Sequence, residues 1–427
     1  MVTAPRRGTA GSYTSTVDSE SLRTLVLIVS IATLSPFISD VAKRWTRVPA
    51  VVIEIGLGIV LGPYVLGWAE LNDVIDFLAE MGLVFLIFLA GFEIDPNVVK
   101  GRPVTLAVIG WLTSLVLAIV VATILHEFGI TSSVRFVAVA LTTTAIGTLL
   151  PILGDAGILP TKLGTSILAS GAMGEIGPIL AISIALETDD PGHTTLLLTA
   201  FASVAALTMW VATRPARPRT VRLISRTLHS SGQLGVRICV LLCLLLVWTA
   251  AEFDLDVLLG AFAAGMVARL FLVGHSGAGD DVTGIADHRE QVQQRLEAIG
   301  FGFFIPIFFV VSGVRFDLDA LLDPIELIKV PMFLFLFLVV RGLPALLYRR
   351  ELLPHDVAAL GLLQSAGLPL VVVITGLGVS SGQLQSDNAA GLVGAGLLSV
   401  VILPIIALSI HHHDTDETAA RTSESAS

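Results

Sequence analysis

The sequence predicts an all-α polytopic membrane protein with about 13 transmembrane helices. Apolar runs near 20 residues, the length that crosses a bilayer as a helix, recur from one end to the other. Only 14% of the 427 residues are charged, far fewer than the surface of a soluble protein of this size needs. The loops between the runs alternate in charge, which is typical of a chain that crosses a membrane repeatedly.

The expected spans follow one another with mostly short connections. They are, in order, 22–40, 48–68, 74–92, 103–125, 134–152, 163–186, 194–212, 236–251, 255–272, 300–316, 325–347, 356–377 and 388–410. The tenth span is short and contains Pro306, so we expect it to be tilted or broken. The stretch before it, 282–298, is too polar to span and is amphipathic, which predicts a surface helix on the cytoplasmic face.

Loop charges predict the orientation in the membrane. Lysines and arginines collect after the odd-numbered spans, and acidic residues collect after the even-numbered ones, with Arg135, Arg315 and Lys329 as basic exceptions. Positively charged loops stay in the cytoplasm. We therefore expect a multi-pass protein of the cell (plasma) membrane, with its N-terminus outside and its C-terminus in the cytoplasm.

The odd number of spans around one long basic loop suggests two six-helix units of opposite orientation, an arrangement common in secondary transporters. The expected organisation is a disordered tail at 1–21, a transmembrane domain at 22–410 with repeat units at about 22–186 and 236–410 linked by 187–235, and a disordered cytoplasmic tail at 411–427. His411, His412 and His413 could bind a metal in isolation, but a solvated tail is the favoured interpretation.

One ionisable residue, Glu175, lies near the middle of the span at 163–186. At about 1.5 Å per residue it is roughly 16–18 Å from either end. A carboxylate at that depth costs several kcal/mol unless a proton, a cation, an arginine or water accompanies it. Burial favours the protonated form and a nearby cation favours the carboxylate, so a proton and a metal ion can compete for this group.

The fifth span of each unit concentrates helix-weakening and hydrogen-bonding residues at mid-membrane. These are Thr142, Thr143, Thr144 and Gly147 in the first unit, and Gln364, Ser365 and Pro369 in the second. Unwound backbone at that depth is tolerated where it lines a cavity or is buried in protein. The matched positions favour two discontinuous helices over the alternative, ordinary packing of small residues.

Several other functions lack support in the sequence. Despite the net charge of −10, no basic stripe with aromatic residues suggests a nucleic-acid partner. No nucleophile–base pair or metal-ligand spacing indicates an enzyme or a cofactor. Cys239 and Cys243, four apart in one apolar run, are expected to be packing residues. Glu54 lies inside the second span, where a structural hydrogen bond is favoured over ion binding.

Four stretches in order carry a family resemblance. They are VPAVVIEIGLGIVLGPYVLG (48–67), LAEMGLVFLIFLAGFEIDP (78–96), LGAFAAGMV (259–267) and GFFIPIFFVVSGVRF (302–316). They resemble helices of bacterial cation:proton antiporters of the Kef and NapA type, and the similarity covers spans 2 to 13. It implies two inverted repeats, a core domain, a dimerisation domain and hence a homodimer. Spans 5 and 12 would be broken helices that cross beside the ion site.

The resemblance also assigns residues. The ion-binding acid of the family matches Glu175, while the polar residue before that acid is replaced here by Gly174. The family's basic residue before the second crossing helix matches Arg341, for which the alternative is an arginine that snorkels to the cytoplasmic surface. Relatives that carry Glu in the second crossing helix differ from this chain, which has Leu368 and Pro369. No nucleotide-binding domain is expected in this chain.

The resulting hypothesis is exchange of H⁺ for Na⁺ or K⁺ by alternating access. The alkali cation would bind at Glu175, with hydroxyls from Thr143, Thr144 and Ser170 and with Arg341 as the charge partner. A single acid makes electroneutral exchange the simpler expectation. Two alternatives remain at this point: a sodium- or proton-coupled transporter of an organic solute with the same fold, and a gated cation pathway or sensor that does not exchange ions.

Overall fold

The computed structural model describes residues 19–42, 49–93, 102–186, 203–204, 207–208, 233–253, 255, 257–274, 282–319 and 327–425, and within them it consists of helices joined by turns and loops. Nine helices in these ranges are long and apolar enough to cross a membrane, and three shorter apolar helices accompany them. Together they match twelve of the predicted spans. The remaining prediction, 194–212, lies outside the described residues apart from four positions.

The helices of the first half are α1 (Ser19–Ala42), α2 (Ala50–Leu61), α3 (Asp73–Glu93), α4 (Arg102–Glu127), α5 (Val134–Leu141), α6 (Ile146–Asp155) and α7 (Lys162–Leu186). Those of the second half are α10 (Leu234–Glu252), α11 (Val257–Gly274), α12 (Val282–Ile299), α13 (Ile305–Val314), α16 (Lys329–Phe337), α17 (Pro354–Gln364), α18 (Pro369–Ser380) and α19 (Ser386–Ser425). Three short segments have other windings: π-helical η1 (Gly300–Phe304) and η2 (Leu338–Gly342), and 3₁₀-helical η3 (Leu343–Tyr348).

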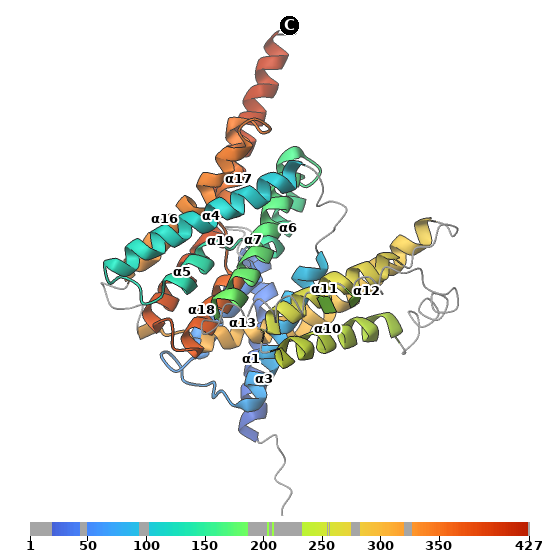
Figure 1. The fold of residues 1–427 in the computed structure, drawn as a ribbon, viewed down its shortest axis with the longest axis vertical. Helices are drawn as coiled ribbons and strands as arrows, with labels where there is room; N and C mark the ends of the chain where they lie inside the picture. The colour runs from blue at the N-terminus through green and yellow to red at the C-terminus, as the bar shows by residue number, and fades with distance from the viewer. Residues whose placement is uncertain are drawn as a thin grey trace, which may run out of the picture.

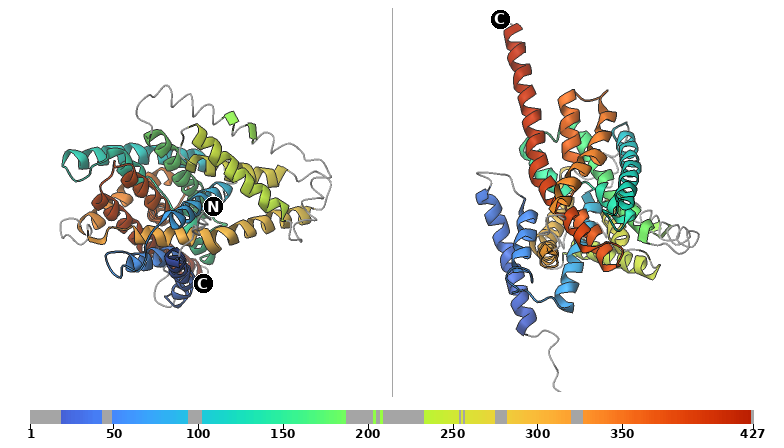
Figure 2. Two further views of the ribbon diagram at one scale, coloured as in Figure 1. Left: turned by 90° about the horizontal axis from the view of Figure 1, so that it is seen from below. Right: turned by 90° about the vertical axis from the view of Figure 1, so that its left-hand side faces the viewer.

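The helices pack in two groups (Figure 1). We call α1–α3 and α10–α13 the panel group, and α4–α7 and α16–α19 the crossing group, because the helices of each pack mainly on one another. In the described residues the main contact between the groups joins α11 to α7. Figure 2 shows α1 on one flank of the molecule and the C-terminal half of α19 extending away from the rest.

Equivalent helices of the two halves make equivalent contacts. In the panel group α3 packs on α11 while α2 packs on α13, and α1 meets α2 as α10 meets α11. In the crossing group α4 packs on α7 as α16 packs on α19. Each half also has one helix interrupted in its middle, α5–α6 and α17–α18. The fold therefore contains the two six-helix repeats that the sequence predicts.

Close approach of backbones holds α2 against α13. A Cβ on Gly58 would overlap the carbonyl oxygen of Val310, and a Cβ on Gly313 would overlap that of Ile55. The two glycines thus face each other across the contact, which is how small residues let membrane helices pack without a hydrophobic driving force. Of the glycines in the second span, Gly58 is the one that this close approach requires.

Two expectations about the second half are wrong. The stretch at 282–298 is not a separate surface helix: α12 continues through η1 into α13, and Val292 and Leu296 are buried. Pro306 does not break this helix, so of the two expectations for the tenth span, tilted or broken, the break is wrong. Its ring would clash with the carbonyl four residues earlier, and the widened π turn of η1 accommodates it.

The C-terminal tail, for which the sequence predicts disorder from 411, is helical as far as Ser425. No Gly or Pro follows Pro404 to end the helix.

Candidate functional site

The interrupted helices cross at their breaks, as expected. α5 ends at Leu141 and α6 begins at Ile146, while α17 ends at Gln364 and α18 begins at Pro369. The backbone N–H of Ala145 donates to the carbonyl of Ala366 at 2.7 Å. The hydroxyl of Thr144 donates to the carbonyl of Gln364 at 2.5 Å. The two unwound segments therefore satisfy each other's backbone groups where no water would do so.

Local chemistry accounts for where the helices stop. Thr142 and Thr143 each donate a hydroxyl hydrogen bond of 2.8 Å to a carbonyl three residues earlier in α5. Ser365 likewise donates to the carbonyl of Gly361 at 2.7 Å. Such side chains offer helix-end carbonyls a partner other than the next turn of helix. Pro369 occupies the first position of α18, where its missing N–H leaves no hydrogen bond unmade.

Glu175 lies on α7 beside this crossing and is 8% exposed. Its Oε1 accepts a hydrogen bond of 3.1 Å from the backbone N–H of Ile146. Ile146 is the first residue of α6, so the carboxylate faces the N-terminus of a half-helix, where the aligned peptide dipoles favour negative charge. The predicted acid and the first crossing helix are thus in direct contact.

Pro178 explains how α7 joins the crossing. It lies inside α7 and has no N–H to donate to the carbonyl of Gly174 four residues earlier. The backbone N–H of Thr144 donates to that carbonyl instead, at 3.0 Å. Removing one hydrogen bond from α7 therefore creates the acceptor that fixes the break of the first crossing helix next to Glu175.

Arg341 is 1% exposed, so the snorkelling alternative is wrong. Its guanidinium donates to Oγ1 of Thr144 at 2.7 and 3.0 Å and to the carbonyl of Ser170 at 3.2 Å. It also reaches the carbonyl of Gln364 at 3.3 Å, at the C-terminal end of α17, where helix dipoles favour positive charge. The Gln364 side-chain amide donates in return to the Arg341 carbonyl.

A widened turn directs Arg341 inward. Residues Leu338–Gly342 form a π turn, and Pro344 follows within the next turn. Proline in a helix cannot donate to the carbonyl four residues earlier and clashes with it, and a π turn is a common way to absorb this. The guanidinium thereby also reaches Oγ of Ser114 on α4, at 3.4 Å. Ser114, a fully buried polar residue in an apolar run, is not among the site residues predicted from the sequence.

Neighbouring side chains occupy the space that a side chain at position 174 would need. A Cβ there would lie 2.5 Å from Oγ1 of Thr144 and 2.8 Å from Nη2 of Arg341. Arg341 and Thr144 thus fill the space beside Glu175 that a polar neighbour would need.

The predicted hydroxyl ligands differ in how they are engaged. The Thr144 hydroxyl donates to Gln364 and accepts from Arg341, which makes it part of the scaffold. The hydroxyls of Thr143 and Ser170 donate to carbonyls of their own helices, at 2.8 and 3.4 Å, and keep oxygen lone pairs. A Cβ on Gly147, in α6, would meet nothing within 4 Å.

A cavity of about 500 Å³ lies between the panel and crossing groups. Its polar lining residues are Glu80, Ser312, Arg315, Asp317, Thr375, Ser380 and Ser386. Most of them lie at or near helix ends next to the acidic loops that follow the even-numbered spans. Arg315 forms an ion pair with Asp76 there, at 2.8 Å.

Three residues outside the crossing behave as expected. Glu54 is buried in the panel group and accepts a hydrogen bond of 2.9 Å from the Ser35 hydroxyl on α1, a structural contact between two helices. Cys239 and Cys243 are buried on α10 and form no disulfide, in agreement with a packing role.

Comparisons with known proteins agree with this architecture. Residues 27–409 match the family model described as "Sodium/hydrogen exchanger, transmembrane". The chain is 25% identical to YjbQ of Bacillus subtilis over 94% of its own length and 65% of that protein, so it spans somewhat less than two thirds of that relative. It is 25% identical to the "Na(+)/H(+) antiporter" of Enterococcus hirae, with 91% of this chain and 97% of that one covered.

The fold is similar to a solved structure, the sodium proton antiporter MjNhaP1 from Methanocaldococcus jannaschii. The TM-score is 0.62 at 14% identity, over 91% of this chain and 96% of that one. Because the family model covers most of its length, the chain belongs to the transmembrane sodium/hydrogen exchanger family and is a multi-pass membrane protein.

Proposed function

We propose that Glu175 is the shared binding site for the proton and for the exchanged cation, Na⁺ or K⁺. One observation carries the proposal: a buried carboxylate contacts the N-terminus of α6 inside the crossing, beside the buried guanidinium of Arg341. An acid at this depth needs a partner. A proton or an alkali cation can neutralise it in turn, and competition for one group couples their opposite movements.

The surrounding groups make both loaded states accessible. The Ile146 N–H and the dipole of α6 stabilise the carboxylate, so a proton can leave without a large rearrangement. Hard oxygen ligands suit an alkali cation, and Thr143, Ser170 and carbonyls of the unwound segments can supply them. Arg341 and Thr144 hold those segments in register through their shared hydrogen bonds. With one acid and Gly174 beside it, we propose electroneutral one-for-one exchange.

Alternating access requires that one part of the protein move past another. The panel and crossing groups pack mainly within themselves, so movement of the crossing group along the panel group breaks few contacts. The cavity between the groups, with Glu80 and Asp317 in its lining, is the proposed approach for cations from the outside. The alternating loop charges support an external N-terminus and a cytoplasmic C-terminus in the plasma membrane. We further propose a Kef/NapA-like subfamily and a homodimer formed through the panel group.

The test is collapse of a pH gradient in everted vesicles on addition of Na⁺, K⁺ or Li⁺, with Glu175→Gln beside the wild type. Glu54→Gln is the matched control, because Glu54 is also a buried acid but lies in the panel group. We expect a cation-dependent response that vanishes in Glu175→Gln and persists in Glu54→Gln. A response that survives in Glu175→Gln would remove the site from Glu175. No response of the wild type to any alkali cation would favour the organic-solute or sensor alternatives.

A further inference from the structure

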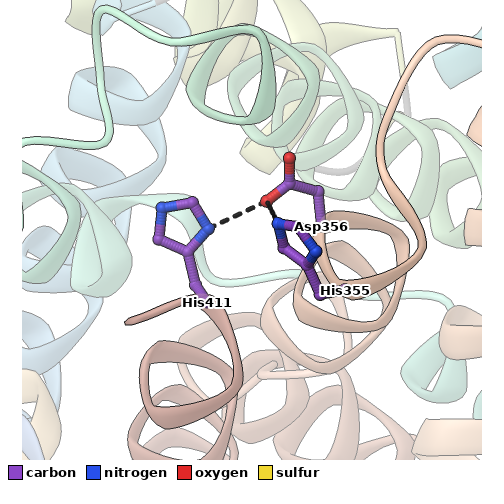
Figure 3. Close-up of side chains that lie close together, drawn as sticks. All are labelled: His355, Asp356 and His411. Atoms are coloured by element: carbon purple, nitrogen blue, oxygen red, sulfur yellow. Dashed lines mark hydrogen bonds and ion pairs between the residues drawn. The ribbon is translucent and has the colours of Figure 1, made fainter. Parts of the chain in front are cut away.

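Three side chains of the types that bind metals lie together outside the crossing: His355, Asp356 and His411 (Figure 3). Nδ1 of His411 lies 2.8 Å from Oδ1 of Asp356, and Nε2 of His355 lies 3.6 Å from the same oxygen. In Figure 3 both imidazole rings turn toward this carboxylate. The three side chains are 14–18% exposed, so they are partly shielded from water yet accessible to a small ion.

Two helices supply the cluster. His355 and Asp356 follow Pro354, the first residue of α17, and His411 lies 55 residues beyond Asp356, at the end of the apolar part of α19. α17 and α19 pack along each other in the crossing group. His411 is therefore not simply part of a solvated tail, as the sequence alone suggests: the packing of two membrane helices brings it to the carboxylate.

The donor set matches a divalent transition metal. All three ligand atoms lie within 4.8 Å of one another. A tetrahedral Zn²⁺ ion with bonds of about 2.0–2.1 Å needs ligand atoms about 3.3 Å apart, which small side-chain rotations would achieve here. Two imidazoles and one carboxylate with an open fourth position suit Zn²⁺ and its neighbours. Alkali cations prefer sites built from oxygen, so this site is chemically distinct from the proposed transport site.

We propose that His355, Asp356 and His411 bind a divalent transition metal ion, with Zn²⁺ the best match. The bound ion joins the start of α17 to the end of the apolar part of α19. Gln364 lies nine residues along α17 from His355, about 13 Å away, and its carbonyl is one of the acceptors of Arg341. Metal binding thus stiffens the helix that carries the second break, without touching the crossing itself.

The experiment uses the full chain, purified without a polyhistidine tag and stripped with a chelator, and titrated with Co²⁺ alone. Co²⁺ bound to nitrogen and oxygen ligands gives visible absorption, and its displacement by Zn²⁺ gives the Zn²⁺ affinity. We expect one ion per chain and at least about tenfold weaker binding in His355→Ala and His411→Ala, since loss of even an outer-shell partner costs 10–100-fold. Asp356→Asn keeps the shape and serves as a further variant if an alanine variant does not fold.

His126→Ala is the matched control, because His126 bonds to a loop carbonyl (2.9 Å to the oxygen of Thr131) outside this cluster, and it should bind Co²⁺ as the wild type does. Absence of a Co²⁺ spectrum in the wild type overturns the proposal. So does unchanged affinity in His355→Ala and Asp356→Asn, with binding lost only in the double variant His412→Ala/His413→Ala, since that would place the ion in the tail.

Discussion

Gly174→Ala is the sharpest test of the crossing geometry, because the change adds one methyl group beside Glu175. The new Cβ would lie 2.5 Å from Oγ1 of Thr144 and 2.8 Å from Nη2 of Arg341. An ordinary contact needs about 3.5 Å, so Thr144 must retreat by roughly 1 Å. That retreat lengthens the hydrogen bond of 2.5 Å to Gln364 and the one of 2.7 Å from Arg341.

Overpacking of this kind costs about 1–3 kcal/mol, against about 1 kcal/mol gained when alanine replaces glycine in a helix. We therefore expect a small loss of thermal stability. Exchange should fall much further, by about 10–100-fold, since a misplacement of about 1 Å at a reacting site has effects of that size. The measurements are the melting temperature in detergent and pH-gradient collapse in vesicles.

Gly147→Ala is the matched control, because Gly147 lies on the first crossing helix and a Cβ there meets nothing within 4 Å. It should exchange ions at the wild-type rate. Equal exchange in Gly174→Ala and Gly147→Ala would refute the argument that Arg341 and Thr144 occupy the space beside Gly174.

Three further predictions follow from other contacts. Arg341→Lys should reduce exchange at least about tenfold, because one ammonium group cannot reproduce the planar fork of donors; wild-type exchange in vesicles would contradict this. Pro178→Ala restores an N–H that competes with the Thr144 amide for the carbonyl of Gly174. The Thr144 amide should therefore exchange its hydrogen for deuterium faster, which mass spectrometry of labelled peptides measures. Unchanged protection of this amide would count against the competition. Gly58→Ala forces a Cβ into a backbone oxygen of α13, whereas the new Cβ in Gly56→Ala meets nothing within 4 Å. Only Gly58→Ala should therefore lower the melting temperature, by the equivalent of about 1–3 kcal/mol. Equal melting temperatures of the two variants would contradict the close approach of α2 and α13.

The parts of the site that the sequence predicts depend on local signals. Glu175 stands out because no other ionisable group shares its apolar run, and the breaks stand out because Thr142–Thr144 and Pro369 weaken helices where they occur. The family resemblance adds the expectation that the two broken helices cross beside the ion-binding acid, Glu175. Most spans, the two repeats and the crossing follow from such signals.

Other features depend on contacts that no local pattern contains. Whether Arg341 points inward or snorkels is decided by a π turn before Pro344, and its distance from the end of the span fits either choice. The His411–Asp356 contact joins positions 55 residues apart. The continuation of α12 into α13 was missed because polarity at 282–298 indicates exposure but not where a helix ends.

The hydrogen bonds of Arg341 have a consequence for synthesis of the protein. Its acceptors Thr144 and Ser170 precede it by 197 and 171 residues. At about 5–20 residues per second, the ribosome adds Arg341 roughly 10–40 s after Thr144. During that interval the first repeat must reside in the membrane with Glu175 present and the second crossing helix absent. The newly made first half is therefore an incomplete transporter that has to wait for its counterpart, and a delay at this stage exposes the chain to membrane quality control.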